Sequence, residues 1–159
     1  MGDPGAVTAY SVVLALHIIA VLAAFGLPLA YPLLMPYVRR RHPAAMPGLH
    51  DVQHRLNVRL TGPGTVLILV LGVYLASRGH HWGALWVDVP LACLLAIGAL
   101  GGAVVVPASR RMAELARADV ATGGGWSEAY EREYRRYLAV EVLLGALVLI
   151  AVFFMAAKP

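Results

Sequence analysis

Charged residues are scarce in this sequence and are absent from long stretches of it. Only 14% of the 159 residues are Asp, Glu, Lys or Arg, whereas 60% are hydrophobic. Soluble domains carry about 25% charged residues, so this composition excludes an ordinary soluble domain. The charge-free stretch 6–38 is longer than the about 20 apolar residues that a helix needs to cross a bilayer.

Cysteine, lysine and the common catalytic motifs are also rare or missing. Cys93 is the only cysteine, which excludes an internal disulfide, and Lys158 is the only lysine. The sequence has no nucleophile elbow, phosphate loop, CxxC pair or paired carboxylates, so it gives no support for ordinary soluble enzyme chemistry. The start MGDPGAV has no basic residue, so we expect no cleaved signal peptide there.

Four charge-poor segments predict four membrane-crossing helices. We expect these segments at about 8–36, 60–78, 88–107 and 137–157, joined by cytoplasmic loops at 37–59 and 108–136. Backbone groups in lipid must be hydrogen-bonded within their own segment, so each segment should be α-helical. The prediction is an all-α, polytopic membrane protein, with residues 1–159 forming a single integral membrane domain built on a four-transmembrane-helix bundle.

The connection between the third and fourth segments is expected to be structured. Three consecutive glycines at 123–125 should break a helix that continues past the membrane, and Ser127 can cap the next helix. The sequence therefore predicts a cytoplasmic helical hairpin between helices three and four.

The arginines predict the orientation of the chain. Eleven of them fall in the two loops 37–59 and 108–136, and basic residues collect in cytoplasmic loops. We therefore expect a multi-pass protein of the bacterial cytoplasmic (inner) membrane with both the N- and C-termini outside. The same rule accounts for the net charge of +4, so the expected partner is the lipid bilayer, and no nucleic acid is expected.

Four residues have predicted structural roles. Asp88 is placed to cap the third helix. Gly98 and Gly102 form a GxxxG pattern that allows close helix approach, either within the bundle or in a homodimer. Glu141 is an acid inside the fourth segment, and such an acid is costly unless it is paired, so we expect an ion pair with an arginine such as Arg59.

His17 is the first candidate for chemistry because it lies inside the first apolar segment. A neutral imidazole in an apolar bundle is a standard axial ligand of haem iron, and His80 or His81 could supply a second ligand. The alternative is a histidine that simply bonds a neighbouring helix, for instance through Tyr74 or a backbone carbonyl. Arg55 and Arg59 could hold an anionic group, either a haem propionate or a lipid phosphate.

A second candidate site lies in the first arginine-rich loop. His50 and His54 have the i,i+4 spacing that lets two imidazoles on one helix meet one metal ion. These residues predict a metal site only if a further ligand joins them.

Four stretches resemble one family of small four-helix bacterial membrane proteins of unknown function. They read LALHIIAVLAAFG, RLNVRLTGPGTVLILVLGVYLA, WVDVPLACLLAIGALGG and FFMAAKP, and the resemblance covers nearly the whole chain. That family is similar to the copper-resistance D-type membrane proteins and to the membrane-bound, haem-binding protoporphyrinogen oxidase of bacteria. The resemblance implies a haem-binding role for His17. The oxidase pattern HVKL is replaced by the run from Asp88 to Leu91, so its lysine is missing and the oxidase activity is not expected.

Three functions remain open from the sequence. The first is binding of haem b or a porphyrin through His17, with Arg55 or Arg59 toward the propionates. The second is a non-enzymatic transport or assembly role through helix–helix contacts. The third is copper handling at His50 and His54.

Overall fold

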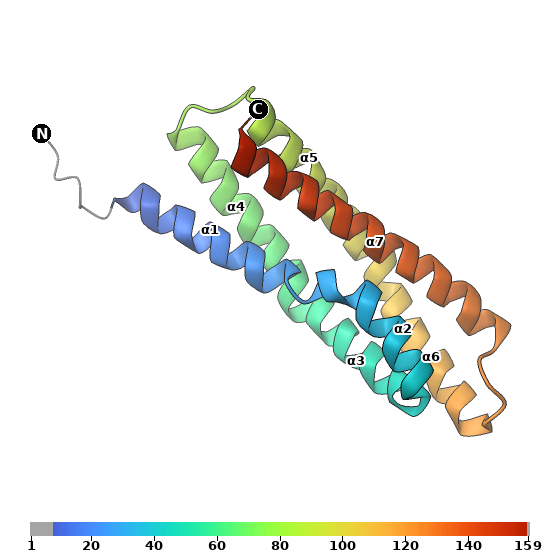
Figure 1. Ribbon diagram of the computed structural model, residues 1–159. Coiled ribbons are helices and arrows are strands. Elements are labelled where there is room, and N and C mark those ends of the chain that lie inside the picture. Colours follow the sequence, from blue (N-terminus) through green and yellow to red (C-terminus); the bar gives the residue numbers. More distant parts are fainter. Residues whose placement is uncertain (1–7, 159) are drawn as a thin grey trace, which may run out of the picture.

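A computed structural model describes residues 8–158, which form four long helices side by side (Figure 1). The expectation about the chain start, residues 1–7, lies outside the described residues. All regular elements in the described part are helical, which confirms the predicted all-α class. Their bounds are α1 Ala9–Phe25, η1 Pro28–Ala30, α2 Tyr31–Arg41, η2 Pro43–Ala45, α3 Met46–Leu56, η3 Asn57–Thr61, α4 Gly62–Arg78, α5 Leu85–Leu100, η4 Gly101–Val105, α6 Val106–Thr122 and α7 Glu128–Ala157.

Each of the four long helices is long and apolar enough to span a membrane. They cover Ala9–Arg41, Pro43–Arg78, Leu85–Thr122 and Glu128–Ala157. The third has 38 residues. At about 1.5 Å per residue such a helix extends well beyond the about 30 Å of a bilayer's hydrocarbon core. Part of the bundle must therefore lie outside the lipid.

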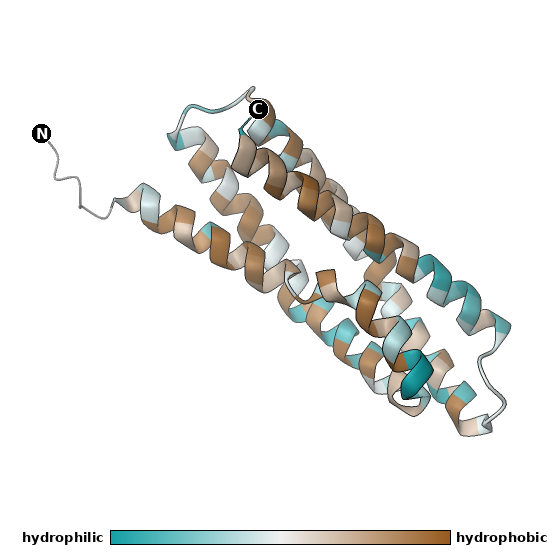
Figure 2. Cartoon of the chain, in the orientation of Figure 1, coloured by the Kyte–Doolittle hydropathy of each residue, from teal (hydrophilic) through white to brown (hydrophobic). Residues whose placement is uncertain are grey.

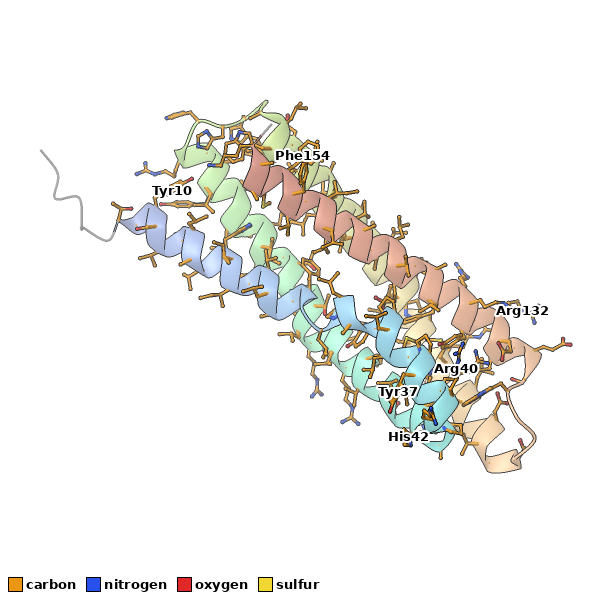
Figure 3. All side chains as sticks on the ribbon, in the orientation of Figure 1. Tyr10, Tyr37, Arg40, His42, Arg132 and Phe154 are labelled. Atoms are coloured by element: carbon orange, nitrogen blue, oxygen red, sulfur yellow. The ribbon has the colours of Figure 1, made fainter. Side chains whose placement is uncertain are left out.

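The two ends of the bundle differ in polarity. The tryptophan end holds the connection 79–84, which contains Trp82, together with Trp86 at the start of α5 and the end of α7. The arginine end holds the connections 42–45 and 123–127, and Arg40 lies there (Figure 3). Figure 2 shows hydrophobic residues concentrated toward the tryptophan end and hydrophilic residues toward the arginine end. The arginine end is therefore the helical extension outside the lipid.

The predicted hairpin between the third and fourth long helices is present within this extension. Gly123 ends α6 with a φ of 66°, a left-handed conformation that favours glycine. The Ser127 hydroxyl accepts a hydrogen bond from the Tyr130 amide at 3.2 Å, which confirms Ser127 as a helix cap. The joining segment 37–59 is also mostly helical, and α3 packs against α6. The extension is therefore a bundle formed by α2, α3, α6 and the beginning of α7.

The prediction that Asp88 caps the third long helix is wrong. Helix α5 begins at Leu85, and its cap position is Ala84, which makes no side-chain cap bond. Asp88 lies inside the first turn instead, where a negative charge favours the helix dipole.

Two clusters of buried side chains hold the bundle together. The cluster at the arginine end is rich in Tyr and Met and includes Tyr31, Met112 and Tyr130. The cluster in the membrane half consists of aliphatic and small residues around Phe25 and Ile97. There α1 packs against α4 and α5 packs against α7, while α4 and α5 contact each other less. The membrane half is therefore two helix pairs, with space between the pairs.

The close approach of α1 to α4 depends on Gly64. A Cβ added at Gly64 would lie 2.8 Å from the Ala24 Cβ. We expect Gly64→Ala to destabilise the protein by about 1–3 kcal/mol, because the two helices must move apart. Thermal unfolding in detergent measures this effect. Gly48→Ala is the matched control, since a Cβ there meets nothing within 4 Å; equal unfolding temperatures for the two variants would refute the packing account.

Candidate functional site

Three of the four long helices depart from regular α geometry around one cavity. The first contains the 3₁₀ turn Pro28–Ala30, and the second and third contain the π-helical segments Asn57–Thr61 and Gly101–Val105. Residues of all three segments line the same space, here called the central cavity. Single π turns are frequent at functional sites.

Prolines account for both π segments. Pro63 and Pro107 each lie two residues beyond the end of a π segment. A proline has no amide hydrogen, and its ring clashes with the carbonyl four residues earlier. Widening the helix by one residue relieves this clash, and the irregular backbone borders a cavity, where it is tolerated within a membrane.

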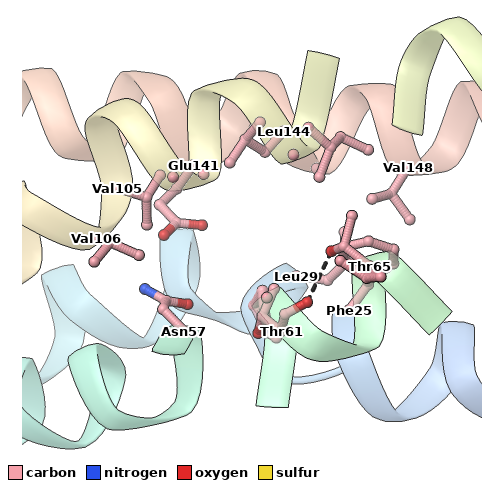
Figure 4. Close-up of a pocket in the computed structure, with 18 residues that line it drawn as sticks. Phe25, Leu29, Asn57, Thr61, Thr65, Val105, Val106, Glu141, Leu144 and Val148 are labelled. Carbon is pink, nitrogen blue, oxygen red and sulfur yellow. Dashed lines mark hydrogen bonds between the residues drawn. The ribbon is translucent and has the colours of Figure 1, made fainter. Parts of the chain in front are cut away.

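The central cavity has a volume of about 210 Å³ and a buried acid on its wall. Glu141 of α7 is 4% exposed, and Asn57 of η3 is 6% exposed. Figure 4 shows the Glu141 carboxylate and the Asn57 amide pointing toward one another across the cavity. The Asn57 Nδ2 has no hydrogen-bond partner in the structure.

The other polar side chains of the central cavity have partners. The Thr61 hydroxyl donates to the Ala24 carbonyl at 3.2 Å, and the Thr65 hydroxyl donates to the Thr61 carbonyl at 2.7 Å (Figure 4). Most of the remaining wall is apolar. Glu141 and Asn57 are therefore the polar groups available to a ligand.

The predicted ion pair between Glu141 and an arginine is wrong. Arg55 and Arg59 are exposed, and within residues 8–158 neither forms an ion pair with Glu141. Each lies two residues from Asn57, which is about half a helical turn. Because Asn57 faces the cavity, the two arginines lie on the outer side of the second long helix.

His17 lines a second space, the tryptophan-end cavity, of about 300 Å³. Its side chain is 6% exposed, and its Nδ1 has no hydrogen-bond partner. Gly72 leaves room for the ring, since a Cβ there would lie 3.3 Å from the His17 Cε1. Of the predicted alternative partners, Tyr74 forms no hydrogen bond with His17 in the described chain, whereas the Ile68 backbone lies next to the ring. The structure thus places a buried imidazole, with one unpartnered nitrogen, in the wall of a largely apolar cavity.

The mouth of the tryptophan-end cavity carries two basic groups, and only one of them, His81, is among the predicted residues. His81 and Lys158 line it, whereas Arg55, Arg59 and His80 do not. The His81 ring lies 4.7 Å from the Trp86 ring, and the Lys158 ammonium lies 5.0 Å from it. The predicted grouping of His17 with Arg55 or Arg59 is therefore wrong.

Three apolar side chains line both cavities: Phe25, Ile97 and Val148. They belong to the core cluster of the membrane half. They form a wall between the two spaces, and the wall lies between the α1–α4 pair and the α5–α7 pair.

His50 and His54 have protein partners instead of a shared ligand. His50 is fully buried, with Nδ1 2.9 Å from the Gln53 Oε1 and Nε2 3.0 Å from the Tyr130 hydroxyl. The His54 Nδ1 lies 3.2 Å from the Val106 carbonyl oxygen. Burial lowers the pKa of His50, which lies in the extension outside the lipid. Metal binding by this pair would require these bonds to break, and the described residues contain no group of three or more potential ligands.

Arg39 is held inside the extension. It forms an ion pair with Glu131, and its guanidinium lies 4.5 Å from the centroid of the Tyr134 ring. Trp126 and Tyr130 stack at 4.4 Å beside it. The i,i+4 spacing of the three aromatic residues is a signal for this cluster, but no local pattern indicates that Arg39 joins it.

Gly98 and Gly102 lie on the wall of the central cavity and are also exposed. The nearest neighbour of a Cβ at Gly98 would be the Thr65 methyl group, at 3.6 Å. The glycine face thus borders the gap between α5 and α4. Association of two copies through this face stays a prediction.

Comparison with known proteins supports the membrane assignment. Neither the curated proteins nor the solved structures include a match to this chain. A family model described as a predicted integral membrane protein matches residues 11–159, which is nearly the whole chain. This protein therefore belongs to the DUF2269 family of predicted integral membrane proteins.

Proposed function

We propose that the protein binds haem b or a similar porphyrin in the tryptophan-end cavity, with His17 as the ligand of the metal. The observation that carries this proposal is the buried His17 side chain, which lines a largely apolar cavity and whose Nδ1 has no hydrogen-bond partner. A buried polar atom without a partner costs about 1–3 kcal/mol, and coordination of a metal would remove that cost. A bound haem would supply an iron whose reactivity depends on its axial ligand and on the polarity of the pocket.

The chemical character of the cavity lining suits such a ligand. The walls are largely apolar, which suits the macrocycle, and Lys158 and His81 at the mouth suit its acidic groups. Pro90 lines the same cavity and stands where the resembling oxidase has its lysine. The resemblance to the haem-binding oxidase and the copper-resistance D-type proteins therefore supports a shared binding position, without the oxidase's lysine.

Titration of the purified protein with hemin tests the proposal. We expect a Soret band that saturates at one hemin per chain and shifts from the position for free hemin in the same detergent. A titration that never saturates, or a band identical to that of hemin in empty micelles, would exclude a specific site.

We also propose that the arginine end faces the bacterial cytoplasm, so that the tryptophan-end cavity opens toward the outer side of the inner membrane. The support is the gathering of arginines at one end, because basic residues orient membrane helices. In a Cys93→Ser background, a membrane-impermeant maleimide applied to spheroplasts should label Trp82→Cys. It should label Arg40→Cys only after permeabilisation, and the reverse pattern would invert the proposed orientation.

A further inference from the structure

We propose that the central cavity binds a small organic ammonium ion, with the Glu141 carboxylate and the Asn57 amide oxygen as its polar contacts. This inference concerns a different cavity from the His17 site and does not depend on porphyrin binding.

The charge of Glu141 is the first argument. Its side chain is buried in the wall of the central cavity. None of the ion pairs of the described chain includes it. No basic side chain lines the central cavity. A buried carboxylate is strongly unfavourable without a counter-charge, so it must hold either a proton or a cation. A cationic ligand and a proton should therefore compete for this group.

The polar groups beside Glu141 are the second argument. The Asn57 amide offers an acceptor oxygen to an ammonium ion, and its Nδ2 is a buried donor without a partner. Tyr137 lies one turn before Glu141 on the same face of α7, and its buried hydroxyl lies next to both the Glu141 carboxylate and the Asn57 amide. Glu141, Asn57 and Tyr137 thus form one buried polar cluster beside the cavity, and this cluster contains no basic group.

The shape of the cavity defines the rest of the ligand. A dry cavity of about 150 Å³ holds one benzene molecule, so the about 210 Å³ here accommodates a small ring and an ammonium group. Beyond Glu141 the wall is formed by apolar side chains such as Phe25, Leu144 and Val148. Ca²⁺ and Mg²⁺ take about six or more oxygen ligands, more than Glu141 and Asn57 supply. The site therefore suits an amine with an apolar body.

The position of the cavity gives such an amine a route of entry. Gly98 and Gly102 line the cavity and are exposed, so the gap beside them reaches the surface of the bundle. An amine in its neutral form dissolves in lipid, enters through this gap and takes the proton from the Glu141 carboxylic acid, which leaves an ammonium–carboxylate pair. The wall of Phe25, Ile97 and Val148 separates the bound ligand from the tryptophan-end cavity.

Isothermal titration of the full-length protein in detergent with benzylammonium chloride tests the inference. Benzyl alcohol, which has the same ring but no charge, is the comparison probe. We expect benzylammonium to bind at least about 10-fold more tightly than benzyl alcohol, a difference of about 1.4 kcal/mol. Its affinity should fall as the pH is lowered, because protons compete for Glu141.

Glu141→Gln should reduce benzylammonium affinity at least about 10-fold and remove the preference over benzyl alcohol, since it keeps the shape but loses the charge. Glu128→Gln, at an exposed acid of the same helix, should bind as the wild type does. Equal binding of the two probes by the wild type would overturn the proposal, and this comparison needs no variant to fold. Unchanged benzylammonium binding by Glu141→Gln would overturn it as well. Hemin titration of Glu141→Gln reports separately on the His17 site.

Discussion

The His17→Ala variant should lose the Soret band and bind added hemin at least about 100-fold more weakly than the wild type. Loss of a group that only supports a metal ligand typically costs 10–100-fold in metal affinity, so loss of the ligand itself should cost more. The apolar walls of the cavity remain in the variant, so some nonspecific binding of hemin should persist without the spectrum of a coordinated imidazole. Absorption spectra recorded during hemin titration measure both effects.

Two control variants separate coordination at His17 from a general loss of structure. His80→Ala removes a histidine near the same end that does not line the cavity, and Arg59→Ala removes an exposed arginine of η3. Both should bind hemin as the wild type does. If His17→Ala binds hemin with unchanged affinity and spectrum, His17 is not the ligand.

Tyr130→Ala should destabilise the protein by about 3–5 kcal/mol, the cost of removing a large buried aromatic side chain. Tyr130 is fully buried and stacks on Trp126 at 4.4 Å. Its hydroxyl lies 3.0 Å from the His50 Nε2, so the substitution also leaves a buried imidazole nitrogen without its partner. Thermal unfolding in detergent, or resistance to proteolysis at the arginine end, measures the loss.

Tyr37→Ala is the matched control, because Tyr37 is 59% exposed at the same end of the bundle (Figure 3). Exposed substitutions usually change stability by no more than about 0.5 kcal/mol. Similar unfolding temperatures for the Tyr130 and Tyr37 variants would show that the buried tyrosine cluster does not stabilise the extension.

The helices and their chemical character could be predicted from local features of the sequence. Charge-poor segments of spanning length, and the glycines that end a helix before Ser127, can be recognised from nearby residues alone. The structure has a long helix at each of the four segments and a break between α6 and α7 at the glycines. The burial of His17 likewise followed from its position inside an apolar segment. Such features need no knowledge of which helix packs against which.

The partners of the buried polar groups could not be predicted, because they depend on helix rotation and on contacts distant in sequence. The π segment Asn57–Thr61 sets which residues of the second long helix face inward, and it places Asn57 rather than Arg55 or Arg59 toward Glu141. In the sequence, a proline such as Pro63 or Pro107 is equally compatible with a helix start, a kink or a π segment.

The long-range contacts at the arginine end could not be predicted from the sequence either. The ion pair between Arg39 and Glu131 joins α2 to α7, and the bond between His50 and Tyr130 joins α3 to α7. The i,i+4 spacing of His50 and His54 suggested a shared metal. Each ring instead bonds its own partners, because α3 packs against α6 and lies close to α7.

The two cavities share one structural origin. The helix pairs α1–α4 and α5–α7 are each closely packed, and both cavities lie between them with Phe25, Ile97 and Val148 as a common wall. His17 serves one cavity and Glu141 the other. The membrane half thus contains two separate cavities, one lined by a buried histidine and the other by a buried acid.

The absorption spectrum of the wild-type protein, purified from haem-replete cells, tests the central claim most directly. The account predicts a Soret band with the features of a histidine-ligated b-type haem, in a fixed ratio to protein. A colourless preparation that also fails to acquire this band when hemin is added would contradict the account.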